Sequence, residues 1–171
     1  MSESERAAML RVDQAGEFGA TRIYAGQLAV MGSRHPIARE IARMAAQEEQ
    51  HRARFDAMLT ARRVRPTALA PLWDVAGFAL GAATALIGPE AAMACTAAIE
   101  TEIDRHYGAQ LDRLDDHDPE LKRTIEEFRA EEVEHRDAAI AAGAERAPAY
   151  PLLSVAIRLG CRAAIRLSER I

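Results

Sequence analysis

QEEQH at residues 47–51 and EEVEH at residues 131–135 are the stretches that decide the fold. In each, a glutamate stands three residues before a histidine, a spacing that puts both side chains on one helix face. The pairs are Glu48 with His51 and Glu132 with His135. Steps of three and four residues, typical of the core stripe of a bundle helix, connect the pairs to apolar neighbours. These are Ile41, Met44, Phe55 and Met58 in one stripe, and Leu121, Ile125, Phe128, Ala139 and Ala142 in the other. Both pairs are therefore predicted to point inward.

Two further glutamates, Glu17 and Glu100, interrupt apolar stripes in the same way. The stripe of Glu17 contains Leu10, Tyr24, Leu28 and Met31, and that of Glu100 contains Met93, Thr96, Ile103, Tyr107 and Leu114. Glu17 lies 31 positions before Glu48 and Glu100 lies 32 before Glu132, which indicates an internal pseudo-repeat of two helix pairs. By the same count, three nearby glutamates fall on other faces: Glu102, Glu131 and Glu134.

Four inward carboxylates need a positive charge near them. An isolated buried carboxylate costs several kcal/mol, and gathering four adds repulsion between like charges. No lysine or arginine occupies these stripes. Two divalent ions bridged by carboxylates, each with one imidazole, satisfy the charge in a pattern known from helical bundles. Oxygen-rich ligation without thiolate favours iron or manganese, and we expect iron. The predicted ligands are Glu17, Glu48, His51, Glu100, Glu132 and His135.

Composition agrees with an all-α chain. Of 171 residues, 49% are hydrophobic and 28% charged, with few aromatic residues and only 7 prolines, and the length suits one domain over residues 1–171. The net charge of −4 offers no basic field for nucleic acid. Cys95 and Cys161 lack the paired spacing of a zinc site or disulfide framework. The N-terminus shows neither a signal peptide nor a transit peptide, so we expect no export.

Capping residues and breakers set the expected helix ends. A capping box of Ser2 and Glu5 starts the first helix, which ends at Met31 before Gly32. The second is expected from Pro36 to about Ala61 and another from about Glu90 to Asp115. The next has Asp118 as N-cap and Pro119 as its first residue, and Gly143 ends it; the last follows Pro151. His35 and His117 are expected in loops.

Two segments lie outside this four-helix pattern. The first is an apolar crossover over about 69–99, uncharged from Val75 to Pro89. It fits either buried crossover helices or a membrane-facing hairpin, and its uncharged run is shorter than the roughly 20 residues of a spanning helix. The second is a basic amphipathic helix over about 152–170. Its arginines recur every four residues and form either a solvated face or a contact with anionic lipid: Arg158, Arg162, Arg166 and Arg170.

Several polar residues near the predicted ligands are candidates for supporting roles. Tyr24 and Tyr107 share ligand stripes, and we favour core tyrosines with a satisfied hydroxyl over redox relays. Tyr107 and His106 are nevertheless the candidates for a catalytic relay. Four further residues lie within one turn of the ligands, and each could either orient a ligand or face solvent: Asp13, Asp104, His106 and Asp137.

Longer motifs extend over nearly the whole chain: RVDQAGEFGATRIYAGQLAV, EEQH, RVRPTALAPLWDVAGFALGAATALIG, AMACTAAIE, EEVEH and LGCRAAIRLSERI. In these motifs the chain resembles the demethoxyubiquinone hydroxylases of ubiquinone biosynthesis. The resemblance implies a ferritin-like four-helix bundle with a di-iron site, an extra apolar crossover helix and a C-terminal amphipathic helix. It assigns the same six ligands as the periodicity. Phe18 stands where the family often has tyrosine, a change outside the metal ligands that we expect to leave the chemistry intact.

The resemblance also implies a reaction. With O2 as co-substrate, one oxygen atom is expected to enter the ring of a 6-methoxy-3-methyl-2-polyprenyl-1,4-benzoquinol and give the 5-hydroxy product. The electrons would come from NADH or from the quinol itself. Because the isoprenoid tail is insoluble in water, the crossover is expected to form an apolar channel or to enter the bilayer. The expected location is peripheral, on the cytoplasmic face of the inner cell membrane. A lipid-binding accessory protein and a homo-oligomer are further expected partners.

Two other classes of function remain open from the residues. The same ligands would serve a ferroxidase, a peroxidase or a tRNA hydroxylase. A ferroxidase needs an acidic ion path and a tRNA enzyme needs a basic groove, so the apolar crossover favours the quinol hydroxylase. A metal-free helical interaction module, docking through the apolar hairpin, is the third reading.

Overall fold

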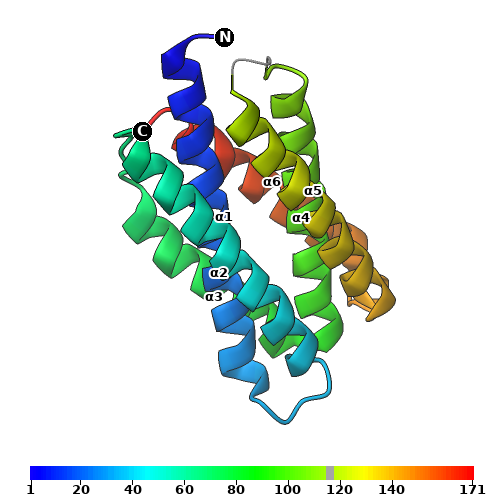
Figure 1. Ribbon diagram of the computed structural model, residues 1–171. Coiled ribbons are helices and arrows are strands. Elements are labelled where there is room, and N and C mark those ends of the chain that lie inside the picture. Colours follow the sequence, from blue (N-terminus) through cyan, green and yellow to red (C-terminus); the bar gives the residue numbers. More distant parts are fainter. Residues whose placement is uncertain (115–117) are drawn as a thin grey trace.

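The computed structural model describes residues 1–114 and 118–171 (Figure 1). Its described part contains α-helices, the short 3-10 helix η1 (Ala144–Arg146) and no strand, which confirms the all-α prediction. The expected helix end at Asp115 and the loop position of His117 lie outside the described residues. The α-helices are α1 (Glu3–Met31), α2 (Ala38–Ala61), α3 (Ala70–Ile87), α4 (Pro89–Leu111), α5 (Pro119–Ala141) and α6 (Tyr150–Ser168).

The helices that carry the Glu and ExxH residues form two packed pairs. α1 packs on α2, and α4 packs on α5, so each half of the pseudo-repeat is one helix pair. The two pairs face each other, with α3 packed on α1 and α4, and α6 packed mainly on α4 (Figure 1). This arrangement confirms a helical bundle with an additional crossover helix and an additional C-terminal helix. It leaves the inward side chains of both pairs facing a common interior.

Most helix ends follow the expected signals. The Ser2 side chain accepts a hydrogen bond from the Glu5 N–H, and the Glu5 carboxylate accepts one from the Ser2 N–H at 2.7 Å. Asp118 caps α5 by accepting from the Leu121 N–H at 3.2 Å. α2 begins at Ala38 rather than Pro36, because the residues before it form turns. α4 ends at Leu111.

Glycines allow the crossover helix α3 to approach α1 closely. A Cβ on Gly81 would collide with the backbone carbonyl of Ile23, and one on Gly26 would collide with the carbonyl of Phe78. At both positions the backbones of α1 and α3 touch directly, and no space is left for a side chain, so only glycine fits. Between α3 and α4, Gly88 has φ +151°, a conformation that favours glycine. The crossover is therefore fixed against the bundle along one side.

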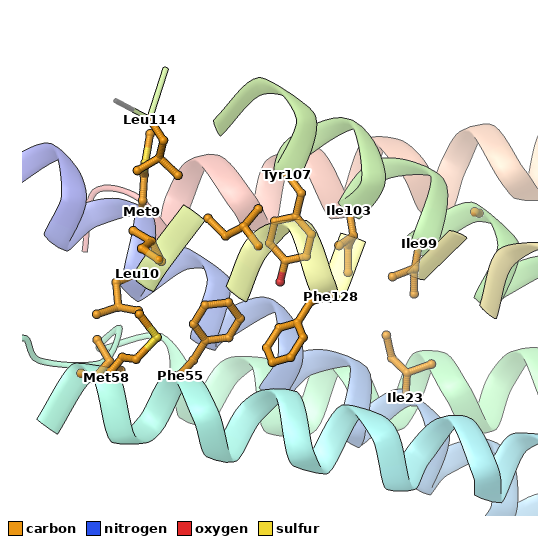
Figure 2. Packing of buried hydrophobic residues seen from close by; sticks show 14 of the residues in the cluster. Met9, Leu10, Ile23, Phe55, Met58, Ile99, Ile103, Tyr107, Leu114 and Phe128 are labelled. Carbon is orange, nitrogen blue, oxygen red and sulfur yellow. The ribbon is translucent and has the colours of Figure 1, made fainter. Parts of the chain in front are cut away.

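One part of the core is built from aromatic and aliphatic side chains of both helix pairs (Figure 2). Phe55 and Phe128 meet edge to face, with ring centroids 5.4 Å apart. The His51 ring stacks on Phe128 at 3.9 Å between centroids. Tyr107 enters the same cluster from α4 (Figure 2). This packing holds the His51 ring in one plane, and it links the apolar core directly to the predicted site.

Candidate metal centre

The structure brings all six predicted ligands together. Each is at most 2% exposed. They form two groups in which one ligand atom per residue lies within 4.8 Å of the others. The first group is Glu17, Glu48, His51 and Glu132, and the second is Glu48, Glu100, Glu132 and His135. Since Glu48 and Glu132 belong to both groups, these two carboxylates lie between two adjacent positions, each of which has one further glutamate and one histidine.

The histidines turn the same ring atom toward the carboxylates. The Nδ1 atom of His51 lies 3.1 Å from Glu132 Oε1 and 3.6 Å from Glu17 Oε2. The Nδ1 atom of His135 lies 3.0 Å from Glu48 Oε1 and 3.2 Å from Glu132 Oε2. Both imidazoles therefore present Nδ1 to the interior and Nε2 to the outer side of the bundle.

The electrostatics show a site that requires positive charge. Burial, together with the neighbouring Glu132 carboxylate, raises the pKa of Glu48 and of Glu100 well above the usual range. Burial alone would lower the pKa of His51, but hydrogen bonds with Glu132 and Glu17 raise it to about 11. Burial would raise the pKa of Glu132, yet hydrogen bonds with His135 and His51 lower it to about 2. Carboxylates buried this closely together repel one another, so the cluster needs a positive charge near it.

The donor set fits a pair of hard or borderline divalent cations. Several buried carboxylate oxygens of the ligands have no hydrogen-bond partner among the described residues, namely Glu17 Oε2, Glu48 Oε2 and Glu100 Oε2. Buried polar atoms are normally satisfied, so each such atom needs an explanation. Carboxylate oxygens and imidazole nitrogens are the donors that iron and manganese accept. A metal pair would occupy these free donors.

Two tyrosines complete the symmetry of the pseudo-repeat. Each stands seven residues after a ligand glutamate, and each reaches the glutamate of the other half. The Tyr24 hydroxyl donates to Glu100 Oε1 at 2.8 Å, and the Tyr107 hydroxyl donates to Glu17 Oε1. Both are buried with a satisfied hydroxyl, the role favoured from the sequence. Each tyrosine fixes the orientation of one glutamate.

The other candidate residues have different partners. His106 Nε2 lies 3.2 Å from Asp13 Oδ1, which also accepts from Gln110 Nε2 at 2.7 Å, so these residues form their own buried cluster. Asp104 pairs with Arg129 and Arg136, and Asp137 pairs with Arg136. Of the four residues considered for orienting a ligand, none hydrogen-bonds one of the six within the described part.

Residues one position away from the ligands contribute more than the sequence indicated. Glu131 Oε2 lies 2.8 Å from His51 Nε2, and Gln47 Oε1 lies 3.0 Å from His135 Nε2. Their positions directly before Glu48 and Glu132 were the available signal. Glu102, expected on another face, is indeed away from the cluster but is only 2% exposed and pairs with two arginines of α6.

The comparison with known proteins agrees with this architecture. The family described as ubiquinone biosynthesis protein COQ7 matches residues 4–168. The chain belongs to this family. The 3-demethoxyubiquinol 3-hydroxylase of Rhodospirillum rubrum is 60% identical over 162 residues, covering 95% of this chain and 76% of the relative. The human mitochondrial NADPH-dependent 3-demethoxyubiquinone 3-hydroxylase is 52% identical, with the same coverage. The mitochondrial 5-demethoxyubiquinone hydroxylase of Saccharomyces cerevisiae is 42% identical, covering 95% and 77%.

This COQ7-family chain contains an apolar cavity of about 490 Å³ beside the cluster. Its walls come from α1, α3, α4 and α6, and they include Ile23, Trp73, Leu80, Ile99, Ile103, Ile157 and Ala164. Gly16 and Gly160 line it with open space where a Cβ would stand. Tyr107 and His106 also line it. The cavity thus extends from the tyrosine that holds Glu17 to the two helices outside the bundle.

Those two outer helices expose large apolar side chains. On α3 they include Val75, Leu86 and Ile87, and on α6 they include Leu152, Val155 and Leu159. Within the described residues, α3 is the one helix whose length and composition would allow it to cross a membrane, and only 22% of it is buried. The same two helices also contribute side chains to the wall of the cavity.

Proposed function

We propose that this chain, with residues 1–171 as one domain, is a di-iron hydroxylase of ubiquinone biosynthesis. Its substrate would be a 6-methoxy-3-methyl-2-polyprenyl-1,4-benzoquinol, converted to the 5-hydroxy product with O2. The observation that carries the proposal is the pair of buried donor groups sharing Glu48 and Glu132. The printed names of the relatives, all hydroxylases of demethoxyubiquinol or demethoxyubiquinone, support the substrate.

Each ligand has a role in this proposal. Glu48 and Glu132 would help to hold both iron ions, Glu17 and His51 would help to hold one of them, and Glu100 and His135 the other. Iron held there supplies the activation of O2 for insertion into the ring. Tyr24 and Tyr107 would keep the terminal glutamates in place through their hydrogen bonds. Tyr107, with His106 beside it, is the proposed proton relay, because it both lines the cavity and donates to Glu17.

The cavity suits the substrate's head group and the first part of its tail. Its volume of about 490 Å³ lies within the range of small-molecule pockets, and its lining is apolar. A ring placed against Tyr107 would lie beside Glu17, while the tail would leave between α3 and α6. Neither an acidic ion path nor a basic groove describes this cavity, which favours the quinol over iron oxidation or tRNA hydroxylation.

Membrane attachment follows from where the tail would leave. The exposed apolar side chains of α3 and α6 would enter the lipid, with basic residues of α6 near anionic headgroups. We propose a peripheral location on the cytoplasmic face of the cell membrane. A lipid-binding accessory protein and self-association would act on this same surface. The human relative's name specifies NADPH, so a reduced nicotinamide nucleotide, or the quinol it reduces, is the proposed reductant.

Oxygen labelling tests the reaction. Protein loaded with iron and reduced anaerobically is mixed with ¹⁸O2 and a short-tailed demethoxyquinol, and the product is weighed by mass spectrometry. The proposal predicts one labelled atom per product molecule and none with Glu48→Ala. Bound iron without product would replace the hydroxylase by a ferroxidase or peroxidase. Protein that binds no iron would support the interaction module instead.

A further inference from the structure

The residue directly before each of the two shared glutamates, Glu48 and Glu132, contacts the ligand histidine of the other helix. Gln47 precedes Glu48 on α2 and contacts the outer nitrogen of His135 on α5, 3.0 Å away. Glu131 precedes Glu132 on α5 and contacts the outer nitrogen of His51 on α2, 2.8 Å away. The two side chains also meet, since Gln47 Nε2 donates to Glu131 Oε2 at 3.3 Å. One hydrogen-bonded pair on the outer side therefore touches both histidines.

The hydrogen bonds of this pair determine which ring nitrogen of each histidine carries a proton. The Gln47 amide is oriented by two partners: its oxygen accepts from Arg43 Nη1 and its nitrogen donates to Glu131. Its oxygen can only accept, so His135 must donate its Nε2–H. The Glu131 carboxylate likewise accepts from His51 Nε2. Both Nδ1 atoms, which face the cluster, are then available as metal ligands.

The two histidines donate to acceptors of different charge. His51 donates to a carboxylate, whereas His135 donates to an amide oxygen that Arg43 already shares. A hydrogen bond to an ionised acceptor is roughly twice as strong as a neutral one. It also raises the basicity of the ring nitrogen that binds the metal. The two halves correspond in their crossed tyrosines. They differ in one further contact, because among the described residues only His51, of the two histidines, stacks on a phenylalanine ring, that of Phe128.

We propose that Gln47 and Glu131 are positioning residues that fix both histidines with Nδ1 inward, and that their difference in charge makes the two metal positions unequal. The position that contains His51 binds its ion more tightly and fills first. This inference rests on the proposed metal centre.

Calorimetric titration of the metal-free protein with Fe(II) under anaerobic conditions measures the two binding steps. Glu131→Gln is expected to weaken the tighter step by about 10–100-fold, the range known for partners of metal-bound histidines, and to bring the two dissociation constants closer together. Glu134→Gln is the matched control, because it removes the same charge from an exposed position on the same helix. It is expected to leave both constants unchanged.

A double variant separates this role from general damage. Glu131→Gln with Gln47→Glu keeps the composition and the side-chain pair but moves the carboxylate to His135. We expect the ratio of the two dissociation constants to be restored. The inference is overturned if Glu131→Gln leaves the ratio unchanged, if Glu134→Gln changes it equally, or if the exchange does not restore it. If two ions bind but one of these three results is found, this inference fails and the hydroxylase proposal stands. If no ion binds, both the inference and the hydroxylase proposal fail. Circular dichroism of each variant verifies the helical fold.

Discussion

Glu100 and Glu102 are two residues apart on α4, and both are buried, yet their hydrogen-bond partners and their pKa shifts are opposite in kind. Glu102 accepts hydrogen bonds from Arg158 at 2.6 Å and from Arg162 at 2.7 and 2.8 Å. These guanidinium groups, Arg162 above all, lower its pKa to about 2. For Glu100, burial and the nearby Glu132 carboxylate raise the pKa well above the usual range. Its hydrogen-bond partner is a neutral tyrosine.

This difference in partners indicates a different role for each carboxylate. Glu102 is neutralised by arginines of the same chain, and it joins α6 to α4. Glu100 belongs to a cluster of four carboxylates in which, among the described residues, the basic side chains are two histidines. Burying such a cluster without a cation is unfavourable. Glu102 is therefore a structural residue, and the Glu100 cluster is complete only with cations from outside.

The largest effect is expected from removing a bridging carboxylate. Glu132→Ala deletes a donor from both metal positions, so iron binding should be lost and hydroxylation should fall by more than about 100-fold. Iron per chain is measured by mass spectrometry of the metal, beside product formation. Glu102→Gln, a change to an equally buried glutamate, should retain its iron. Equal iron loss in the two variants would contradict the distinction between them.

Metal loading should stabilise the protein. A ligand that binds only the folded state at about 100 times its dissociation constant adds about 2.7 kcal/mol. For a chain of this length that corresponds to a rise in Tm of about 5–10 °C. Thermal unfolding is followed by circular dichroism with a chelator and with anaerobic Fe(II). Glu132→Ala should show no such rise, and an unchanged Tm in the unmodified protein would argue against a metal centre.

Breaking the Glu102 cluster should affect stability rather than metal content. Glu102→Gln removes the charge that two arginines share, and we expect a loss of about 1–3 kcal/mol in the free energy of unfolding. The lower part of the range applies if the arginines, about one-third exposed, turn to solvent. Urea unfolding of the metal-free proteins measures the difference.

The same pair of proteins gives a pH test. Because the folded-state pKa of Glu102 is about 2, below its ordinary value of 4.5, its stabilisation is present above pH 4.5. It should be lost as the pH falls from 4.5 through 2. The stability difference between the unmodified protein and Glu102→Gln should therefore be constant from pH 7 to 5 and shrink below. A difference that grew in acid would contradict the ion-pair account.

The smallest effect concerns the row of C-terminal arginines. The sequence predicted all four on one helix, but α6 ends at Ser168, so Arg170 lies in the turn that follows it. Arg158 and Arg162 hold Glu102, whereas Arg166 and Arg170 have no ion pair among the described residues. Arg166→Ala and Arg170→Ala should each weaken binding to anionic vesicles by about 1 kcal/mol at low salt. Co-sedimentation measures this. Unchanged binding in both variants, or no binding by the unmodified protein, would remove the headgroup contact.

The sequence predicted the bundle and the six clustered residues because one rule covers them. On α1, α2, α4 and α5 the inward face repeats every three or four residues, so a glutamate or histidine within an apolar stripe stands out. Glu17 and Glu100 were found by this rule alone. The capping residues Ser2 and Asp118 were recognisable because they act within a few residues of the chain.

The same rule fails where a helix contacts more than one neighbour. α4 packs against α6 as well as α5, so the face of Glu102 is buried although it lies off the central stripe. Glu131 and Gln47 lie one position off their stripes, and their side chains reach across the groove between α2 and α5. Two of the four C-terminal arginines, Arg158 and Arg162, pair with Glu102. This pairing depends on how α6 packs on α4, so the sequence of α6 alone could not predict it.

Anomalous diffraction at the iron edge, from crystals of iron-loaded protein, would locate the metal ions themselves. We expect two peaks between Glu48 and Glu132, one at bonding distance from His51 Nδ1 and the other at bonding distance from His135 Nδ1. A single peak, no peak, or peaks away from these nitrogens would contradict the two-metal centre on which the proposed function depends.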